Sequence, residues 1–272
     1  MTKATTGDIA DSDVVAEADR EYRGRPLRWW KEVAAATVFY IVYSFIRNMQ
    51  GSASVSDNLA MRNARRIIDL EELMGLYHER SIQEAFLDAD LLMSIWNLFY
   101  GTFHFVVTIG VLVFLFLKFP SRYRRWRTIL AATTGLALVG FILYPLMPPR
   151  LMPPSYGYVD SLKVYGSLWS FDSGAMNKIS NQFAAMPSLH FAWSLWCACA
   201  LVPALKRTWT KALAVLYPVL TLFPIVITGN HFGLDAAGGA LVLVGGMAIS
   251  ATVPDVMARV RRRRSTTPVG AA

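Results

Sequence analysis

The sequence predicts an all-α, polytopic membrane protein with six transmembrane helices and amphipathic helices on the outer membrane surface. Of its 272 residues, 54% are hydrophobic, which exceeds the usual content of a soluble domain. Six segments are apolar enough to cross a bilayer, which takes about 20 helical residues. Short basic clusters alternate with these segments. We expect one membrane domain, residues 25–255, between a disordered cytoplasmic tail, residues 1–24, and a basic cytoplasmic tail, residues 256–272.

The six predicted spans differ in length and character. The first is short and marginal, whereas the sixth carries Gly-Gly pairs, which allow helices to pack closely. In chain order the spans cover residues 33–47, 91–117, 128–147, 187–205, 212–228 and 235–253.

The basic clusters predict the orientation of the chain. They read RGRPLRWWK, KFPSRYRRWR, KRTWTK and RVRRRR, and six spans place all four on one side. The positive-inside rule makes that side cytoplasmic. We therefore expect both termini in the cytoplasm, the protein in the plasma (cell) membrane, and the loops of residues 54–90 and 148–186 outside. The net charge of +8 then marks membrane-flanking loops and not nucleic-acid binding, since no recognition motif accompanies it.

The segment of residues 54–90 is too charged to cross the bilayer and predicts two short amphipathic helices on the outer surface. Ile67, Leu70 and Met74 share one helical face, and Gly75 is a candidate helix end. The charged residues of this segment are expected in solvent, including Glu71, Glu72 and His78.

Polar residues stand at the ends of otherwise apolar segments. The stretch NQFAAMPSLHFAWSLW, residues 181–196, places His190 at the mouth of the fourth predicted span. The stretch TGNHFGLDAAGG, residues 228–239, carries His231 and Asp235 where the fifth span ends and the sixth begins. Both stretches fall at the same membrane face, so the topology brings the three side chains to one depth. His231 and Asp235 are spaced i, i+4, which on a helix places them within hydrogen-bonding reach.

These residues carry a resemblance to a known family. Pro187-Ser188-Leu189-His190 and His231-x-x-x-Asp235 resemble the last two signature motifs of the type-2 phosphatidic acid phosphatase superfamily. The similarity covers roughly residues 90–250, including the order of the helices. Members are six-helix membrane enzymes that act on lipid phosphates through a phosphohistidine. The resemblance implies metal-free chemistry, so we expect no cofactor and no metal, although two histidines and an aspartate are also a possible zinc ligand set.

The resemblance implies a role for each residue. His231 attacks phosphorus as a neutral imidazole oriented by Asp235, and His190 protonates the leaving oxygen. The Ser188 hydroxyl and the backbone N–H groups at the start of the fourth span cradle phosphate oxygens. Arg150, just outside the third span, is the first candidate for a cationic clamp on the phosphate, and Lys178 is a weaker one.

The sequence also departs from the lipid phosphatases of that superfamily. They carry Lys-x6-Arg-Pro before the first histidine and Ser-Arg six or seven residues before the second. Here Leu151 follows Arg150, no lysine stands at the required spacing, and Pro224 and Ile225 occupy the Ser-Arg positions. PSLH, with YPLMPPR upstream, is more similar to the inositol phosphorylceramide synthase branch, whose members move a phosphorylated headgroup between lipids.

The resemblance thus implies a phosphotransferase that moves a phosphate-containing headgroup from a membrane phospholipid or polyprenyl phosphate to a lipid alcohol. One alternative is a phosphatase that hydrolyses phosphatidate or a polyprenyl phosphate, with water as the acceptor. Another is a non-catalytic lipid-binding or transport protein on the same fold, which would not need the nucleophile.

A second polar set lies inside the second predicted span. Asn97, Tyr100 and His104 stand at i, i+3 and i+7 and share one face. Polar groups within a membrane usually point into the helix bundle. We favour hydrogen bonds between helices for this set over lining of the substrate cavity.

Overall fold

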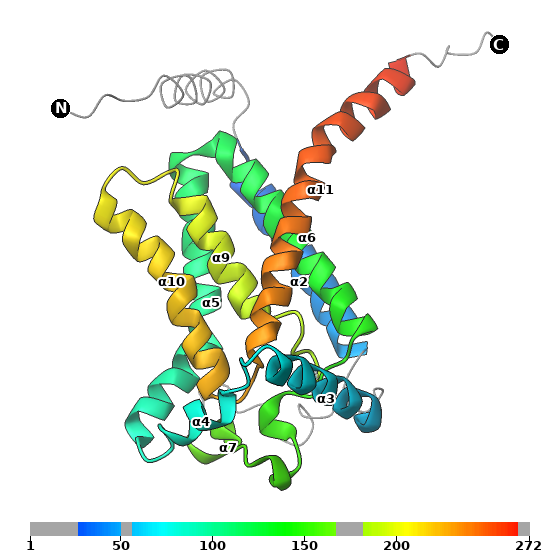
Figure 1. The fold of residues 1–272 in the computed structure, drawn as a ribbon. Coiled ribbons are helices and arrows are strands. Elements are labelled where there is room, and N and C mark those ends of the chain that lie inside the picture. Colours follow the sequence, from blue (N-terminus) through cyan, green and yellow to red (C-terminus); the bar gives the residue numbers. More distant parts are fainter. Residues whose placement is uncertain (1–26, 50–55, 167–181, 266–272) are drawn as a thin grey trace.

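The computed structural model describes residues 27–49, 56–166 and 182–265, and for residues 47–49 and 253–265 it describes the helix backbone alone. Within these ranges the protein is helical and has no strand. Figure 1 shows upright helices in a bundle, with shorter helices gathered across one end. The all-α prediction is confirmed for the described part of the chain. The predicted tail of residues 1–24 lies outside it, whereas residues 256–265 of the predicted C-terminal tail continue the last helix, Gly233–Ser265.

Each of the six predicted spans overlaps a helix of the bundle, although the spans of residues 128–147, 187–205 and 212–228 extend beyond their helices. In chain order the helices are α2 (Trp29–Met49), α5 (Asp90–Lys118), α6 (Pro120–Leu143), α9 (Leu189–Leu201), α10 (Thr208–Ile227) and α11 (Gly233–Ser265). Two of them are central, because α6 contacts α2, α5, α9 and α11, and α9 contacts α5, α6, α10 and α11.

Four of these helices are long and apolar enough to cross a membrane by length and composition, namely α5, α6, α10 and the Gly233–Thr252 part of α11. The chain thus has the character of a membrane protein. The six-span prediction is supported for these four alone. Helix α9 is apolar but has only 13 residues, fewer than the expected segment of residues 187–205.

The Gly-Gly pairs of the sixth predicted span do allow close packing. A Cβ atom at Gly239 would lie 2.5 Å from the carbonyl oxygen of Ser188, at the start of α9. A Cβ atom at Gly246 would lie 2.3 Å from Thr133 Oγ1 and 2.9 Å from the carbonyl oxygen of Ile129, both on α6. Larger residues at these two positions would push α11 away from its neighbours.

Short helices gather at one end of the bundle, which we call the capped end (Figure 1). They are α3 (Asp57–Leu73), α4 (Glu79–Glu84), η1 (Pro149–Leu151), η2 (Pro154–Tyr156) and α7 (Ser161–Val164). Helix α3 ends as predicted, since Gly75 has a φ of 68° and the Leu76 N–H donates to the Glu71 carbonyl at 2.7 Å.

The buried face of α3 differs from the predicted one. Leu70 and Met74 are 44% and 53% exposed, although both were expected beside Ile67 on one face. The buried face is shifted toward Glu71, which is fully buried, so its expected place in solvent is wrong. Its neighbour Glu72 is exposed, as predicted. The buried set is Ala60, Asn63, Ala64, Ile67, Ile68 and Glu71.

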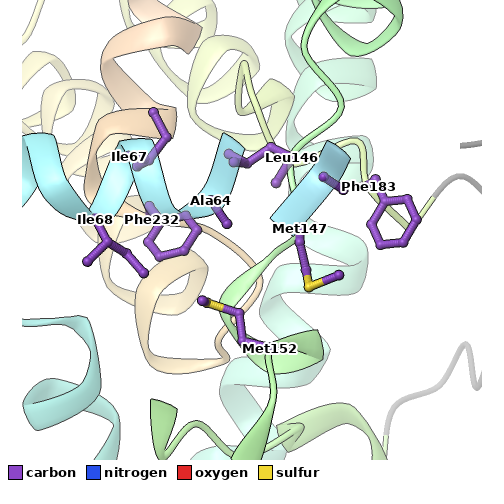
Figure 2. Close-up of a cluster of buried hydrophobic side chains, with 10 residues drawn as sticks. Ala64, Ile67, Ile68, Leu146, Met147, Met152, Phe183 and Phe232 are labelled. Carbon is purple, nitrogen blue, oxygen red and sulfur yellow. The ribbon is translucent and has the colours of Figure 1, made fainter. Parts of the chain in front are cut away.

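The shift follows from what α3 packs against. Its buried side chains form one apolar cluster with residues from three distant segments, and Figure 2 shows Ile67 and Ile68 beside Phe232. Ala60 and Ala64 are small, which lets the α3 backbone approach these segments closely. Phe232 follows His231 directly, so the cluster fixes the turn that carries His231. The residues from the other segments are Leu146, Met147, Met152, Phe183, Ala185 and Phe232.

The opposite end of the bundle, which we call the basic end, includes the basic clusters of residues 118–127 and 206–211 (Figure 1). Arg122, on α6, donates to the carbonyl oxygen of Pro203 at 2.8 Å. This bond connects the start of α6 to the segment between α9 and α10. Glu32 on α2 pairs with Arg127 and accepts a hydrogen bond from Tyr123 at 3.1 Å, both on α6. These two clusters lie at one end, as the alternation of basic clusters and spans predicts.

Candidate active site

His231 lies in a tight turn that joins α10 to α11. The N–H of His231 donates back to the Ile225 carbonyl at 3.0 Å, and Gly229 has a φ of 68°, a conformation that side-chain-bearing residues rarely adopt. A Cβ atom at Gly229 would also lie 3.0 Å from Gln83 Nε2 and 3.3 Å from Arg150 Cβ. Both the backbone conformation and the close neighbours therefore call for glycine at this position.

Asp235 is fully buried and holds the turn together. Its Oδ2 atom accepts hydrogen bonds from the Phe232 N–H at 3.0 Å and from His231 Nδ1 at 3.1 Å. Because α11 begins at Gly233, Asp235 is its third residue and reaches back over the helix start, as the acidic member of a capping box does. The expected contact with His231 is present. Because His231 precedes α11, the two residues do not share a helical face, and the contact is made through the helix cap instead.

The other ring nitrogen of His231 points at two hydroxyl groups. His231 Nε2 lies 3.5 Å from Ser188 Oγ and 3.5 Å from the Tyr100 hydroxyl. A proton on Nδ1 that is donated to Asp235 leaves the Nε2 lone pair facing these hydroxyls. His231 is only 3% exposed, so this lone pair lies in a protected space.

His190 faces His231 from the first turn of α9. The two rings are in a T-shaped arrangement with centroids 5.6 Å apart. The Tyr100 ring stacks on His190 at 4.0 Å, and the His104 ring meets it at 4.2 Å. Helix α5 thus fixes the His190 ring through two of the three polar residues that were predicted to share a face.

Ser188 joins the two motifs. It is the N-cap of α9, where its Oγ atom accepts from the Phe191 N–H at 3.4 Å. Its own N–H donates to the Asp235 carbonyl at 2.9 Å. The start of α9 and the start of α11 are therefore bonded directly, and His190, His231 and Asp235 lie together as the topology predicted.

A small pocket opens beside His190, between α5, α9 and α10. Most of its wall is aromatic or aliphatic, and the wall includes Ile225, which is fully buried. Tyr100 and His104 line it, whereas Asn97 is not among the lining residues. These are Phe99, Tyr100, His104, His190, Tyr217, Thr221, Pro224 and Ile225.

Asn97 makes hydrogen bonds to a segment at the capped end. Its Nδ2 atom donates to the carbonyl oxygens of Ser161 at 2.9 Å and Gly166 at 3.0 Å, and Ser161 Oγ donates to its Oδ1 atom at 2.9 Å. These bonds tie α5 to the segment of α7, so Asn97 is an anchor for the capped end. Asn97 therefore makes hydrogen bonds, as we favoured for this set, but they reach a loop segment and not another long helix.

Arg150 lies against the turn that carries His231. Its N–H donates to the Gly229 carbonyl at 2.8 Å, and its Nε atom donates to Asn230 Oδ1 at 2.9 Å. Its Nη1 atom forms an ion pair with Asp160 at 3.1 Å, and both side chains are largely buried. The Nη2 donors have no partner among the described residues. Lys178, the weaker clamp candidate, lies outside the described residues.

Several residues at this site were not singled out in the sequence. Asn230 and Asp160 both bind Arg150, and only Asn230 carried a signal, since it adjoins His231. Two buried carboxylates also reach the first turn of α11. Glu79 Oε1 accepts from the Gly233 N–H at 2.9 Å, and Glu71 Oε1 accepts from the Leu234 N–H at 2.7 Å. The described residues form no cluster of three His, Cys, Asp or Glu side chains arranged to hold a metal ion.

The chain matches a known protein family over the region that contains this site. A family model described as the PAP2 superfamily matches residues 65–249, which is more than half of the chain. The matched region contains Arg150, His190, His231 and Asp235. No curated protein and no solved structure matches the chain.

Proposed function

The chain belongs to the PAP2 superfamily, and on that premise we propose that it transfers a phosphate-containing headgroup from a lipid donor to a lipid alcohol. Membership supports an enzyme of the phosphatase or phosphotransferase type, with lipid phosphates as substrates. The observation that carries the proposal is the His231 imidazole, held by the buried Asp235 carboxylate, with Nε2 facing a protected space.

The first step forms a covalent adduct. The Nε2 lone pair of His231 attacks phosphorus, and the bond between phosphorus and the donor's alcohol oxygen breaks. Asp235 stabilises the positive charge that develops on the imidazole and keeps its proton on Nδ1. The Ser188 hydroxyl lies 3.5 Å from Nε2, close enough to donate to an oxygen of a phosphate group that His231 attacks.

His190 supplies the proton that the leaving oxygen needs. Imidazole titrates near neutrality, which suits a group that gives a proton in one step and takes it back in the next. In the second step His190 accepts the proton of the incoming alcohol, whose oxygen attacks phosphorus and releases His231. The ring positions, 5.6 Å apart with the pocket beside His190, support these two roles.

The negative oxygens of the phosphate need positive partners. The backbone N–H groups at the start of α9 and the Ser188 hydroxyl supply donors on one side. We assign the clamp to Arg150, whose Nη2 donors have no partner among the described residues and whose Nε is fixed by Asn230 beside His231. Asp160 holds the guanidinium in place, as a carboxylate does for a bidentate anion site.

The apolar pocket favours transfer to a lipid alcohol. Pro224 and Ile225 stand where the superfamily's phosphatases carry Ser-Arg, so the wall beside His190 is apolar and lacks that cation. An alcohol carried on a hydrocarbon chain fits such a wall better than water or a second charged group does. We further propose that the capped end faces the cell exterior in the plasma membrane, since the basic clusters mark the opposite end as cytoplasmic.

Trapping of the adduct tests the mechanism. The purified protein is mixed with a phosphorus-labelled phospholipid or polyprenyl phosphate, quenched rapidly and mapped by peptide. We expect label on the peptide that contains His231, and neither label nor turnover in His231→Ala. In His190→Ala, activated aryl phosphates should react far better than lipid donors, since their leaving groups need little protonation.

The products separate the competing functions. A new labelled lipid supports transfer to an alcohol, whereas inorganic phosphate alone would identify a phosphatase. Label on His190 would reverse the roles of the two histidines. Full activity of His231→Ala would exclude the covalent mechanism, and a biological function that survives this substitution without any turnover would favour a lipid-binding or transport protein.

A further inference from the structure

Two carboxyl groups from the capped end bind the first turn of α11, directly after His231. Glu71 on α3 and Glu79 on α4 each accept a backbone N–H with their Oε1 atom, from Leu234 and Gly233 respectively. Both side chains are buried, at 0% and 3% exposed. A Cβ atom at Gly233 would lie 3.2 Å from Glu79 Oε1 and 3.4 Å from Glu71 Oε1, so both carboxyl groups approach the helix start closely.

Ionisation of all the carboxyl groups at the start of α11 would destabilise the folded state. Asp235 is a third buried carboxylate at the same helix start, and repulsion acts between Glu71 and both of the others. The helix N-terminus offers only about half a positive charge to balance them. The Oε2 atoms of Glu71 and Glu79 are buried and meet no donor in the described part of the chain. A proton on one of them supplies the missing donor, since the two carboxyl groups approach the same point, the Cβ position of Gly233.

We propose that Glu71 and Glu79 are positioning residues, which share one proton and hold the first turn of α11, and through it His231 and Asp235, in the catalytic arrangement. The inference rests on the proposed function for its catalytic part. The path of contact is short. The N–H groups of residues 233 and 234 bind the pair, and Asp235 in the same turn binds His231 and the Phe232 N–H.

The pair makes the turn sensitive to pH. Burial, followed by repulsion from Glu79 and Asp235, raises the pKa of Glu71 from 4.5 to about 8. The other ionisable groups that face the pair are the Tyr77 and Tyr158 phenols, whose pKa values are raised by burial. A group with a raised pKa in the folded state stabilises fully below its unfolded pKa, and this contribution is lost as the pH rises to about 8. The doubly ionised pair should then loosen the turn.

The test compares three variants of the full-length protein in detergent or lipid discs. Glu71→Gln keeps the acceptor for Leu234 and carries a permanent donor toward Glu79, so it mimics the protonated pair. Glu71→Ala removes both the acceptor for the Leu234 N–H and the donor toward Glu79. Glu72→Gln changes the exposed neighbour on the same helix and is the matched control. We would measure the midpoint of thermal unfolding from pH 5 to 9, hydrogen exchange of the peptide spanning residues 228–240, and kcat and KM across the same pH range.

We expect the unfolding midpoint of the parent to fall from about pH 5 to about pH 8 and to level off above that, and that of Glu71→Gln to stay nearly constant. Glu71→Gln should keep the parent's kcat within about twofold at pH 7 and hold it further into alkaline pH. Glu71→Ala should exchange faster in residues 228–240 and lose about 10- to 100-fold in kcat with little change in KM, because the nucleophile is misplaced while substrate contacts remain. Glu72→Gln should match the parent in every measurement.

Two results would overturn the inference. Equal pH dependence of unfolding in the parent and Glu71→Gln would exclude the shared proton, and this comparison holds even if Glu71→Ala does not fold. Exchange in residues 228–240 that is the same in Glu71→Ala and Glu72→Gln would exclude the positioning role. If no protein in the series, the parent included, turns over a lipid phosphate, the proposed function fails, and the unfolding and exchange data still decide whether the pair holds the turn.

Discussion

The capped end and the basic end of the bundle are built from different interactions. At the capped end, buried polar side chains bind backbone groups of distant segments. Asn63 donates to the Pro145 carbonyl at 2.8 Å, and Gln83 donates to the Ile227 carbonyl at 3.1 Å. At the basic end, the contacts involve partly exposed charges such as Arg127, which is 40% exposed.

The two kinds of interaction differ in how tightly they hold side chains and backbone in one geometry. A buried hydrogen bond holds its partners in one geometry, and its loss leaves an unpaired group that costs about 1–3 kcal/mol. An exposed ion pair contributes about 0–1 kcal/mol and tolerates movement. The capped end therefore has the interactions that can hold a catalytic turn, whereas the basic end has those that suffice to orient a chain in a membrane.

Labelling should separate the two ends completely. In a Cys197→Ala, Cys199→Ala background, Lys163→Cys places a thiol at an exposed position of the capped end, and Arg207→Cys places one at the basic end. With an impermeant reagent on intact cells, we expect the first to be labelled and the second only after permeabilisation. The reverse pattern would invert the proposed orientation of the whole chain.

Asp235→Asn should have the next largest effect. Asparagine keeps an acceptor for the Phe232 N–H, so the helix cap and the fold should remain. The imidazole of His231 loses its orienting charge, and turnover should fall by about 10²–10⁴-fold. Steady-state kinetics measures the loss, and the thermal unfolding midpoint is the control. A variant that unfolds early would attribute the loss to the cap instead.

Arg150→Lys should cost less, about tenfold or more in kcat/KM, because lysine keeps the charge but cannot bind Asn230 and a phosphate together. Lys163→Gln is the matched control, since Lys163 also pairs with Asp160, at 3.6 Å, yet is 57% exposed. We expect it to leave turnover unchanged. Parent-like kinetics for Arg150→Ala would show that Arg150 serves packing and that another cation clamps the phosphate.

Arg127→Gln, at the basic end, should have the smallest effect. It breaks the pair with Glu32, which still accepts a hydrogen bond from Tyr123. We expect turnover within about twofold of the parent, since the pair lies at the end of the bundle opposite His231. A tenfold loss of turnover with an intact fold would contradict the division between the two ends.

Hydropathy and the two motifs predicted much of this structure. Each predicted apolar segment overlaps a helix, because a run of apolar residues must satisfy its backbone within itself in a membrane. His190, His231 and Asp235 meet because helix order alone puts two loops at one face. These predictions depend on local composition and on topology, both of which a sequence displays.

Tertiary contacts explain the features that the sequence did not predict. The face of α3 was predicted from Ile67, Leu70 and Met74, but the partner cluster selected Ile68 and buried Glu71 instead. No periodicity shows that a glutamate will meet the start of a helix some 160 residues later. Asn97 likewise took its role from the α7 segment, and Arg150 from Asp160. In each case the role of a polar side chain depends on a partner that sequence spacing does not reveal.

The brevity of α9 has a consequence for how a lipid reaches the histidines. Its 13 residues rise about 1.5 Å each, so the helix is roughly 20 Å long, while the hydrocarbon layer is about 30 Å thick. If its Leu201 end lies level with the boundary of the inner leaflet, the His190 end stops about 10 Å short of the outer boundary. A headgroup must then sink below the plane of its neighbours, or the outer leaflet must thin around the protein. Lateral entry from the bilayer, and not capture from water, is the route that this depth favours.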